Sequence, residues 1–278
     1  MNVRRTSRRR FLKQSAAGAS VLALGAALHP LAYAAEPEEK WIELFDGKTL
    51  EGWHKNPQRI GHGTGGQWEV IDGIITGQQD PPGSGNGGIL LTDRKFGDFE
   101  LVIDMMPDWG VDSGLFVRGN DRGQCFQMMV DYHQAGNVGH LYGEGTGGFN
   151  TRTFDINGNL DSRGQLESLT TANAKKPDDV GLLASCTPEE WLKAWKVGDW
   201  NTARVRVVDK YPHITTWIND LLVCDFDGDK AATAGYDKEK VFESLSEQGS
   251  IAVQVHGGTG AWPKGAVCRW KNVRVREL

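Results

Sequence analysis

The stretch Ser113 to Asp131, SGLFVRGNDRGQCFQMMVD, predicts two strands joined by a turn at residues 119–123. The second strand sorts its side chains by parity. One face carries Phe126, Met128 and Val130, which is typical of a core. The other face carries Cys125, Gln127, Met129 and Asp131. A face with amide and carboxylate groups is either solvent-exposed sheet or the floor of a binding cleft, and alternation alone leaves both open.

A second segment near the C-terminus repeats this pattern. Ile251, Val253 and Val255 alternate with more polar positions, which include Gln254 and His256. If both segments lie in one sheet, a carboxylate, two amides and an imidazole converge on one surface. A histidine beside the glycine-rich residues 257–260 is otherwise an ordinary surface histidine.

The rest of the chain consists mostly of short strands and turns. Asp72-Gly73 predicts a tight hairpin, and residues 99–105, 203–207 and 214–218 alternate as half-buried strands. A short helix is expected from Pro188, with Thr187 and Glu190 forming a capping box. A slip of phase near Lys271-Asn272 predicts a β-bulge. We therefore expect one all-β domain, an antiparallel β-sandwich, over residues 35–278.

One long polar segment interrupts the strand pattern. Residues 143–181 carry several glycines and the charged run Lys175-Lys176-Pro177-Asp178-Asp179. We expect a structureless insert at the rim of the sandwich, either functional or mobile.

Composition excludes some function classes. The chain has 278 residues, 36 glycines, ten tryptophans and a net charge of −5. Residues 1–34 contain six basic residues and no acid, so the remainder carries about −11. A negative surface argues against nucleic acid as a partner, because phosphates require basic patches. Abundant aromatic side chains suit sugar binding, although most tryptophans in a β-sandwich belong to the core.

Residues 1–34 are expected to be a twin-arginine signal peptide. Arg9-Arg10 precedes Phe11-Leu12-Lys13, an apolar stretch follows, and Ala32-Tyr33-Ala34 is a small-x-small cleavage site. The apolar stretch is too short for a membrane span, so no stable membrane anchor is expected after cleavage. The mature protein would be periplasmic or secreted. The cysteines Cys125, Cys186, Cys224 and Cys268 show no zinc-site spacing, and we expect at most one disulfide.

Five blocks, in order, resemble the 3-keto-disaccharide hydrolase domain family over about residues 41–278. They are residues 44–53 (LFDGKTLEGW), 113–118, 127–131, 198–201 with 217–219, and 251–256 with 270–273. This resemblance implies a concanavalin A-like, jelly-roll sandwich. It also implies cleavage of glycosides or disaccharides already oxidised to a ketone at sugar carbon 3. The chain departs from the family pattern at Lys271, where arginine is usual, and at Cys125, where glutamate is common.

The chemistry of a 3-keto-glycoside requires a base and a group that stabilises an enolate. The ketone acidifies the hydrogen on C2, the aglycone leaves from C1, and water adds to the enone, which gives net hydrolysis. The base is expected to be His256 or Asp131. The expected substrate-binding residues are Gln127, Arg118, Gln254, Lys271, His140 and Glu144.

A divalent cation would also stabilise the enolate. His133, His140, Asp131 and Glu144 lie close in sequence, but their spacing is no recognised metal pattern, so the metal requirement stays open. The paired carboxylates of an ordinary sandwich glucanase, Glu-x-Asp-x-x-Glu, do not occur in the sequence. The alternative function is a non-catalytic, lectin-like carbohydrate-binding module. The oligomeric state is left open by the sequence.

Overall fold

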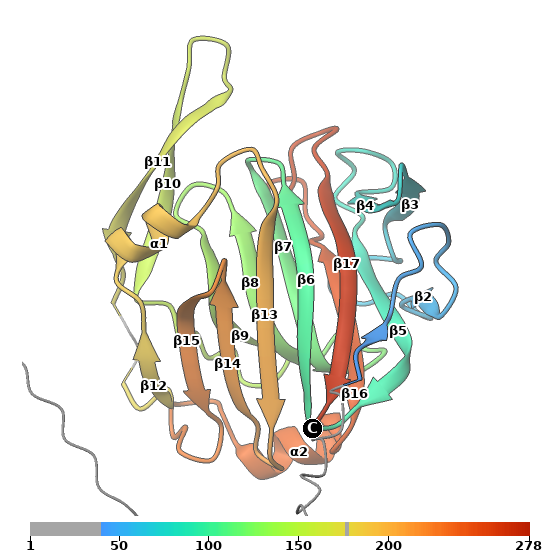
Figure 1. Ribbon diagram of the computed structural model, residues 1–278, viewed down its shortest axis with the longest axis vertical. Coiled ribbons are helices and arrows are strands. Elements are labelled where there is room, and N and C mark those ends of the chain that lie inside the picture. The colour runs from blue at the N-terminus through green and yellow to red at the C-terminus, as the bar shows by residue number, and fades with distance from the viewer. Residues whose placement is uncertain (1–39, 176–177) are drawn as a thin grey trace, which may run out of the picture. The chain divides into compact units, whose positions relative to one another are not determined.

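Two antiparallel sheets are packed face to face in the computed structural model, which describes residues 40–175 and 178–278 (Figure 1). The expected signal peptide, residues 1–34, lies outside the described residues. The described residues all belong to one compact unit. Across the described ranges, no helix is both long enough and apolar enough to cross a membrane.

The larger sheet has nine strands. Its path runs through β12 (Leu182–Ser185), β15 (Leu221–Asp227), β14 (His213–Ile218), β13 (Asn201–Val208), β6 (Phe99–Pro107), β17 (Cys268–Glu277), β4 (Ile74–Gln78) and β3 (Gln67–Ile71), and β1 (Ile42–Glu43) pairs with β17.

The smaller sheet has six strands and lies behind the larger one in Figure 1. Its order is β2 (Trp53–Lys55), β5 (Gly88–Phe96), β16 (Gly249–Val255), β7 (Val111–Gly119), β8 (Cys125–Tyr132) and β9 (Asn137–Glu144). Because β16 and β8 are both neighbours of β7, the two segments that carry the polar alternation share one sheet.

The expected parity is confirmed in both segments. Phe126, Met128 and Val130 lie in the main core between the sheets, together with Ile251, Val253 and Val255. The opposite face of the six-stranded sheet carries a second apolar cluster of Ile89, Leu91, Phe116, Cys125 and Ala252. Burial, together with the charge of Glu144, raises the pKa of the Cys125 thiol well above its usual range. Cys125 is therefore a packed, neutral side chain rather than a substitute for an acid.

Several local predictions are confirmed. The Asp72-Gly73 hairpin joins β3 to β4. Helix α1 (Pro188–Ala194) begins at N-cap Thr187 with the Glu190 capping box in place. The register between β17 and β6 shifts between Lys271 and Arg274, which is the expected bulge. The four cysteines are all buried and free.

The expectation of a structureless insert at residues 143–181 is wrong. Strands β10 (Phe154–Leu160) and β11 (Leu166–Asn173) form a hairpin that projects beyond the sandwich, next to α1 (Figure 1). Only Phe154 and Ile156, at the base of β10, are buried, and the remaining residues of the two strands are half-buried or exposed, so the sequence shows little hydrophobic periodicity. Helix α2 (Lys238–Leu245) lies at the other end of the sandwich.

Candidate active site

A cleft of about 210 Å³ lies on the outward face of the six-stranded sheet. Its lining residues come from β7, β8, β9, the segment after β9 and the end of β16: Asp112, Gln127, Met129, Asp131, Tyr142, Glu144, Asn150 and His256. The face opposite the core residues of β8 is therefore a cleft floor. Four of the residues expected at the site, Gln127, Asp131, Glu144 and His256, meet there.

Antiparallel pairing brings the most reactive groups to one end of the sheet. Asp112 is at the start of β7 and pairs in register with Asp131, near the end of β8. His256 directly follows β16, and its backbone N–H donates to the Asp112 carbonyl at 3.3 Å. At Gly114 an added Cβ would lie 2.5 Å from Nε2 of Gln127. This glycine therefore leaves the space that the Gln127 side chain occupies on the floor.

The His256 side chain is half-buried, and its surroundings determine which ring nitrogen carries the proton. Its Nδ1 lies 2.5 Å from the carbonyl oxygen of Gly257, which can only accept. Nδ1 therefore carries a proton, and Nε2 of the neutral ring is left as an acceptor. The ring of His62 packs edge-on against it, with 4.7 Å between the ring centroids.

A buried polar network lies beside His256. Nε2 of Gln127 donates to Oε1 of Gln254 at 3.3 Å, and Nε2 of Gln254 lies 3.2 Å from Nε2 of His62. His62 Nε2 is also 3.6 Å from Oε1 of Glu144. Gln254 is fully buried, so it orients its neighbours rather than facing the cleft.

Four members of this site were missed by the sequence analysis: Asp112, Tyr142, Asn150 and His62. Asp112 shares the outward parity of Gly114, and Tyr142 shares that of Glu144, so strand parity contained a signal for both. His62 lies in the glycine-rich residues 61–66, where only the glycines marked a close approach. Burial and the charges of Glu144 and Asp131 raise the pKa of Tyr142, which keeps its hydroxyl protonated as a donor.

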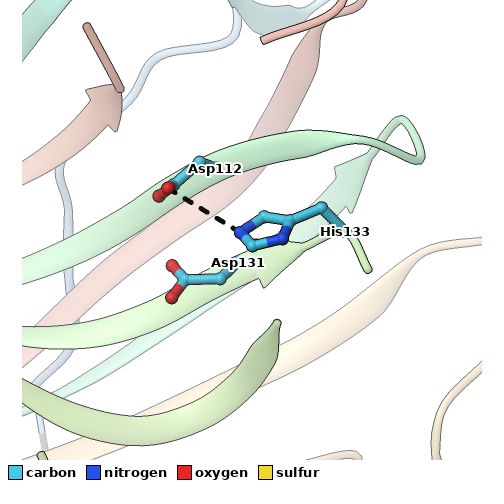
Figure 2. A group of neighbouring side chains, drawn as sticks. All are labelled: Asp112, Asp131 and His133. Carbon is cyan, nitrogen blue, oxygen red and sulfur yellow. Dashed lines mark ion pairs between the residues drawn. The ribbon is translucent and has the colours of Figure 1, made fainter. Parts of the chain in front are cut away.

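Figure 2 shows a group of three ionisable side chains at the β7–β8 end of the cleft. The ligand atoms of Asp112, Asp131 and His133 lie within 4.8 Å of one another. Burial raises the pKa of Asp131 well above its usual range, and the charges of Asp112 and Glu144 add to this. Burial lowers the pKa of His133, but Asp112 and the Gln134 carbonyl outweigh it, so the net direction is upward.

Besides the buried Gln254, three expected substrate-binding residues are not at the cleft, and two of them are displaced by bulges. Where β16 pairs with β7, Ser250 pairs with Gly119 and Ala252 with Phe116, so β7 carries an extra residue that turns Arg118 away. Its guanidinium is buried and binds Asp98 at 3.0 Å and the carbonyls of Asp209 and Glu247. Arg118 therefore connects the segments around Asp98, Asp209 and Glu247 and stabilises the fold.

His140 is displaced by a bulge in β9, where the register with β8 shifts between Met128 and Val130. Its ring is fully buried, contacts Phe154 edge-on, and its Nδ1 lies 3.1 Å from Oδ1 of Asn137. Burial lowers the pKa of His140 to about 3, so it is neutral.

Lys271 lies on β17, in the nine-stranded sheet, while the cleft belongs to the other sheet. Its Nζ is 4.0 Å from the centroid of the Trp200 ring. The bulge is present, but it does not direct this side chain to the cleft.

A larger hollow, of about 710 Å³, lies between the β10–β11 hairpin and residues 263–266. Trp109 and Tyr132 contribute aromatic surface to it. Its single carboxylate, Asp108, is paired with Arg269 at 2.7 Å, and its lining residues include no histidine and no second carboxylate. The smaller cleft therefore carries the reactive groups.

The comparisons with known proteins agree with this fold. A model of the 3-keto-alpha-glucoside-1,2-lyase-like domain matches residues 40–276. A 3-keto-disaccharide hydrolase from Bacteroides thetaiotaomicron is 34% identical over 82 residues, 27% of this chain and 26% of the relative. The match thus spans about a quarter of that relative's length.

A solved protein from Parabacteroides distasonis, named as a glycosyl hydrolase, has a TM-score of 0.50 at 20% identity, over 86% of this chain and all of that chain. At this identity the likeness concerns the fold alone. The family resemblance expected from the five sequence blocks is confirmed, and the chain belongs to the family of 3-keto-alpha-glucoside-1,2-lyase-like domains.

Proposed function

We propose that this protein is an exported enzyme that cleaves 3-keto-glycosides or 3-keto-disaccharides by elimination and hydration. A base removes the C2 proton, the C1–O bond to the aglycone breaks, and the aglycone leaves with a proton. Water then adds to the enone, with its oxygen at C1 and a proton at C2. The family match and the name of the Bacteroides relative support this substrate class. The expected leader at residues 1–34 supports export.

His256 is the proposed base. The single observation that supports this role most is the contact of Nδ1 with the Gly257 carbonyl, which leaves Nε2 of the neutral ring as the acceptor. A positioned base of this kind contributes about 10²- to 10⁴-fold to the rate. Asp131 is the weaker candidate, because its carboxyl is buried next to Asp112 and tends to keep its proton.

A donor for the developing enolate oxygen would come from the cleft floor. Both N–H groups of the Gln127 amide already donate, to the Ser113 carbonyl and to Gln254, so Gln127 shapes the floor that it lines. The protonated Tyr142 hydroxyl is the proposed donor. Preorganised donors of this kind act best where water is largely excluded.

The test is aglycone release from a chromogenic 3-keto-glucoside by the purified protein. We expect His256→Ala to lower kcat/KM by at least about 10²-fold. The matched control is His213→Ala, because His213 is another half-buried histidine, paired with Asp225 at 2.7 Å, but it lies on β14 of the other sheet. This control is expected to keep wild-type activity.

Circular dichroism and thermal unfolding would establish that both variants are folded. An unchanged rate in folded His256→Ala would remove the base assignment. No release by the wild type, with retained binding of sugar, would replace the enzyme with the carbohydrate-binding module.

A further inference from the structure

Asp112, Asp131 and His133 form a three-ligand set at the edge of the cleft (Figure 2). His133 Nε2 lies 3.7 Å from Oδ2 of Asp112, and all three ligand atoms are within 4.8 Å of one another. Asp112 and Asp131 face each other across β7 and β8, so the sheet itself fixes their separation, and His133 directly follows β8.

The Oδ1 atom of Asp131 is the second observation. It is buried and has no hydrogen-bond partner anywhere in residues 40–175 and 178–278. A buried carboxylate oxygen without a partner is costly, and native proteins rarely leave one. The charge of Arg152 acts on Asp131, but its guanidinium pairs with Asp155 at 3.3 Å and makes no hydrogen bond to Oδ1 of Asp131.

His133 is oriented as a metal-binding histidine usually is. Its Nδ1 donates to the carbonyl oxygen of Gln134 at 2.9 Å, since that oxygen can only accept. The lone pair of the neutral ring is then on Nε2, the nitrogen that faces Asp112. A backbone carbonyl on the far nitrogen is the contact that fixes tautomer and ring orientation in metal sites.

We propose that Asp112, Asp131 and His133 bind one divalent first-row transition-metal ion, such as Mn²⁺ or Zn²⁺. One nitrogen and two carboxylate oxygens suit these ions, whereas Ca²⁺ takes six to eight oxygen ligands. Three protein ligands leave coordination positions open, as in catalytic metal sites. Asp112 and Asp131 both line the cleft, so those positions face the bound substrate.

The site would act on the enolate oxygen, a role that rests on the proposed function. The ion would bind the 3-keto oxygen as a Lewis acid and stabilise the negative charge that develops when the C2 proton leaves. Asp131 is then a ligand, which leaves His256 as the base.

The test is Mn²⁺ binding to the full chain after dialysis against chelator, by calorimetry and by electron paramagnetic resonance. We expect one ion per chain, and an affinity loss of at least about 10²-fold in Asp131→Asn and His133→Gln, since outer contacts alone are worth 10- to 100-fold. The control His213→Gln removes another His–Asp pair, on β14, and is expected to bind as wild type does. Excess Ca²⁺ is expected to displace little Mn²⁺.

Folding is checked in the same samples. Mn²⁺ is expected to raise the Tm of wild type and of His213→Gln, but not that of the near-isosteric Asp112→Asn. Absent saturable binding, or equal affinity in wild type and the ligand variants, would overturn the site. Aglycone release that survives chelation, with no Mn²⁺ bound, would overturn the metal while leaving the function. One bound Mn²⁺ without aglycone release would support the site and remove the proposed function.

Discussion

The outward faces of the two sheets both carry rows of polar and aromatic side chains, but they use them differently. On the nine-stranded sheet, charged side chains contact oppositely charged or aromatic neighbours on the same sheet. Glu100 contacts Arg204 at 3.2 Å and Arg276 at 2.8 Å, and the Arg204 guanidinium lies 3.9 Å from the centre of the Trp217 ring. On the six-stranded sheet, two carboxylates and a histidine meet at one end, and the buried Oδ1 of Asp131 has no hydrogen-bond partner in the described part of the chain.

This contrast separates structural charge from reactive charge. A charged side chain on a strand stabilises the fold when its partners are already present. A charged side chain is available to a ligand when several such groups lie close together and one of their polar atoms has no hydrogen-bond partner. Perturbed carboxyl groups in a cleft are accordingly candidates for function, while matched pairs on an outer face are not. The comparison makes testable statements about residues outside the cleft.

Arg118 is expected to show the largest effect, and on stability alone. Arg118→Met removes the partner of Asp98 and of two backbone carbonyls, at Glu247 and Asp209, from a buried position. Breaking such a set costs roughly 2–4 kcal/mol. Urea unfolding at pH 7 measures this loss. The value of kcat/KM per folded molecule should stay within about twofold of wild type, and a large drop would return Arg118 to the site.

His140 is expected to have the next largest effect, and to reveal it through pH. Its folded pKa is lowered to about 3, below the ordinary value near 6.5, so the unfolded chain binds the proton more readily. This contribution therefore lowers stability as pH falls from about 6.5 toward 3, by up to about 1.4 kcal/mol per pH unit. At pH 7 it carries no penalty.

The variant His140→Gln removes this titration. Urea unfolding between pH 7 and pH 4.5 should show a flatter loss of stability on acidification than in wild type. The control His213→Gln leaves His140 in place and should retain the steeper loss. Equal slopes in wild type and His140→Gln would contradict the buried, neutral assignment.

The sequence predicted the fold class and much of the cleft because the side-chain period of a strand is two. Strand parity placed Gln127, Asp131 and His256 on the correct face of the sheet. It did so because β8 continues without interruption past Gln127 and β16 continues without interruption to Val255. The same rule failed for Arg118 and His140, because each lies at a bulge where an extra residue reverses the face. The bulge at Lys271 could be predicted from the sequence, because apolar residues before and after it fall on opposite faces of a regular strand. The bulges near Arg118 and His140 have no such change in the apolar pattern.

Two further differences between the sequence prediction and the structure have physical causes. Strand alternation does not say which sheet a strand joins, so Lys271 was expected near a cleft that belongs to the other sheet. Loops carry no periodicity at all, so His62 could not be placed. The β10–β11 hairpin was missed because only Phe154 and Ile156 at its base are buried, and burial is what creates a readable hydrophobic pattern.

Lys271 offers the smallest and sharpest test of the comparison between the two faces. Its ammonium lies over the Trp200 ring at 4.0 Å, an exposed contact worth about 0.5–1 kcal/mol. Lys271→Met keeps an apolar side chain on the ring and removes the charge, so unfolding free energy should fall by no more than this amount. Because β17 belongs to the nine-stranded sheet, kcat/KM on a 3-keto-glucoside should be unchanged. A tenfold loss of kcat/KM at unchanged stability would mean that the outer face takes part in substrate binding, and the division between structural and reactive charge would then no longer follow the two sheets.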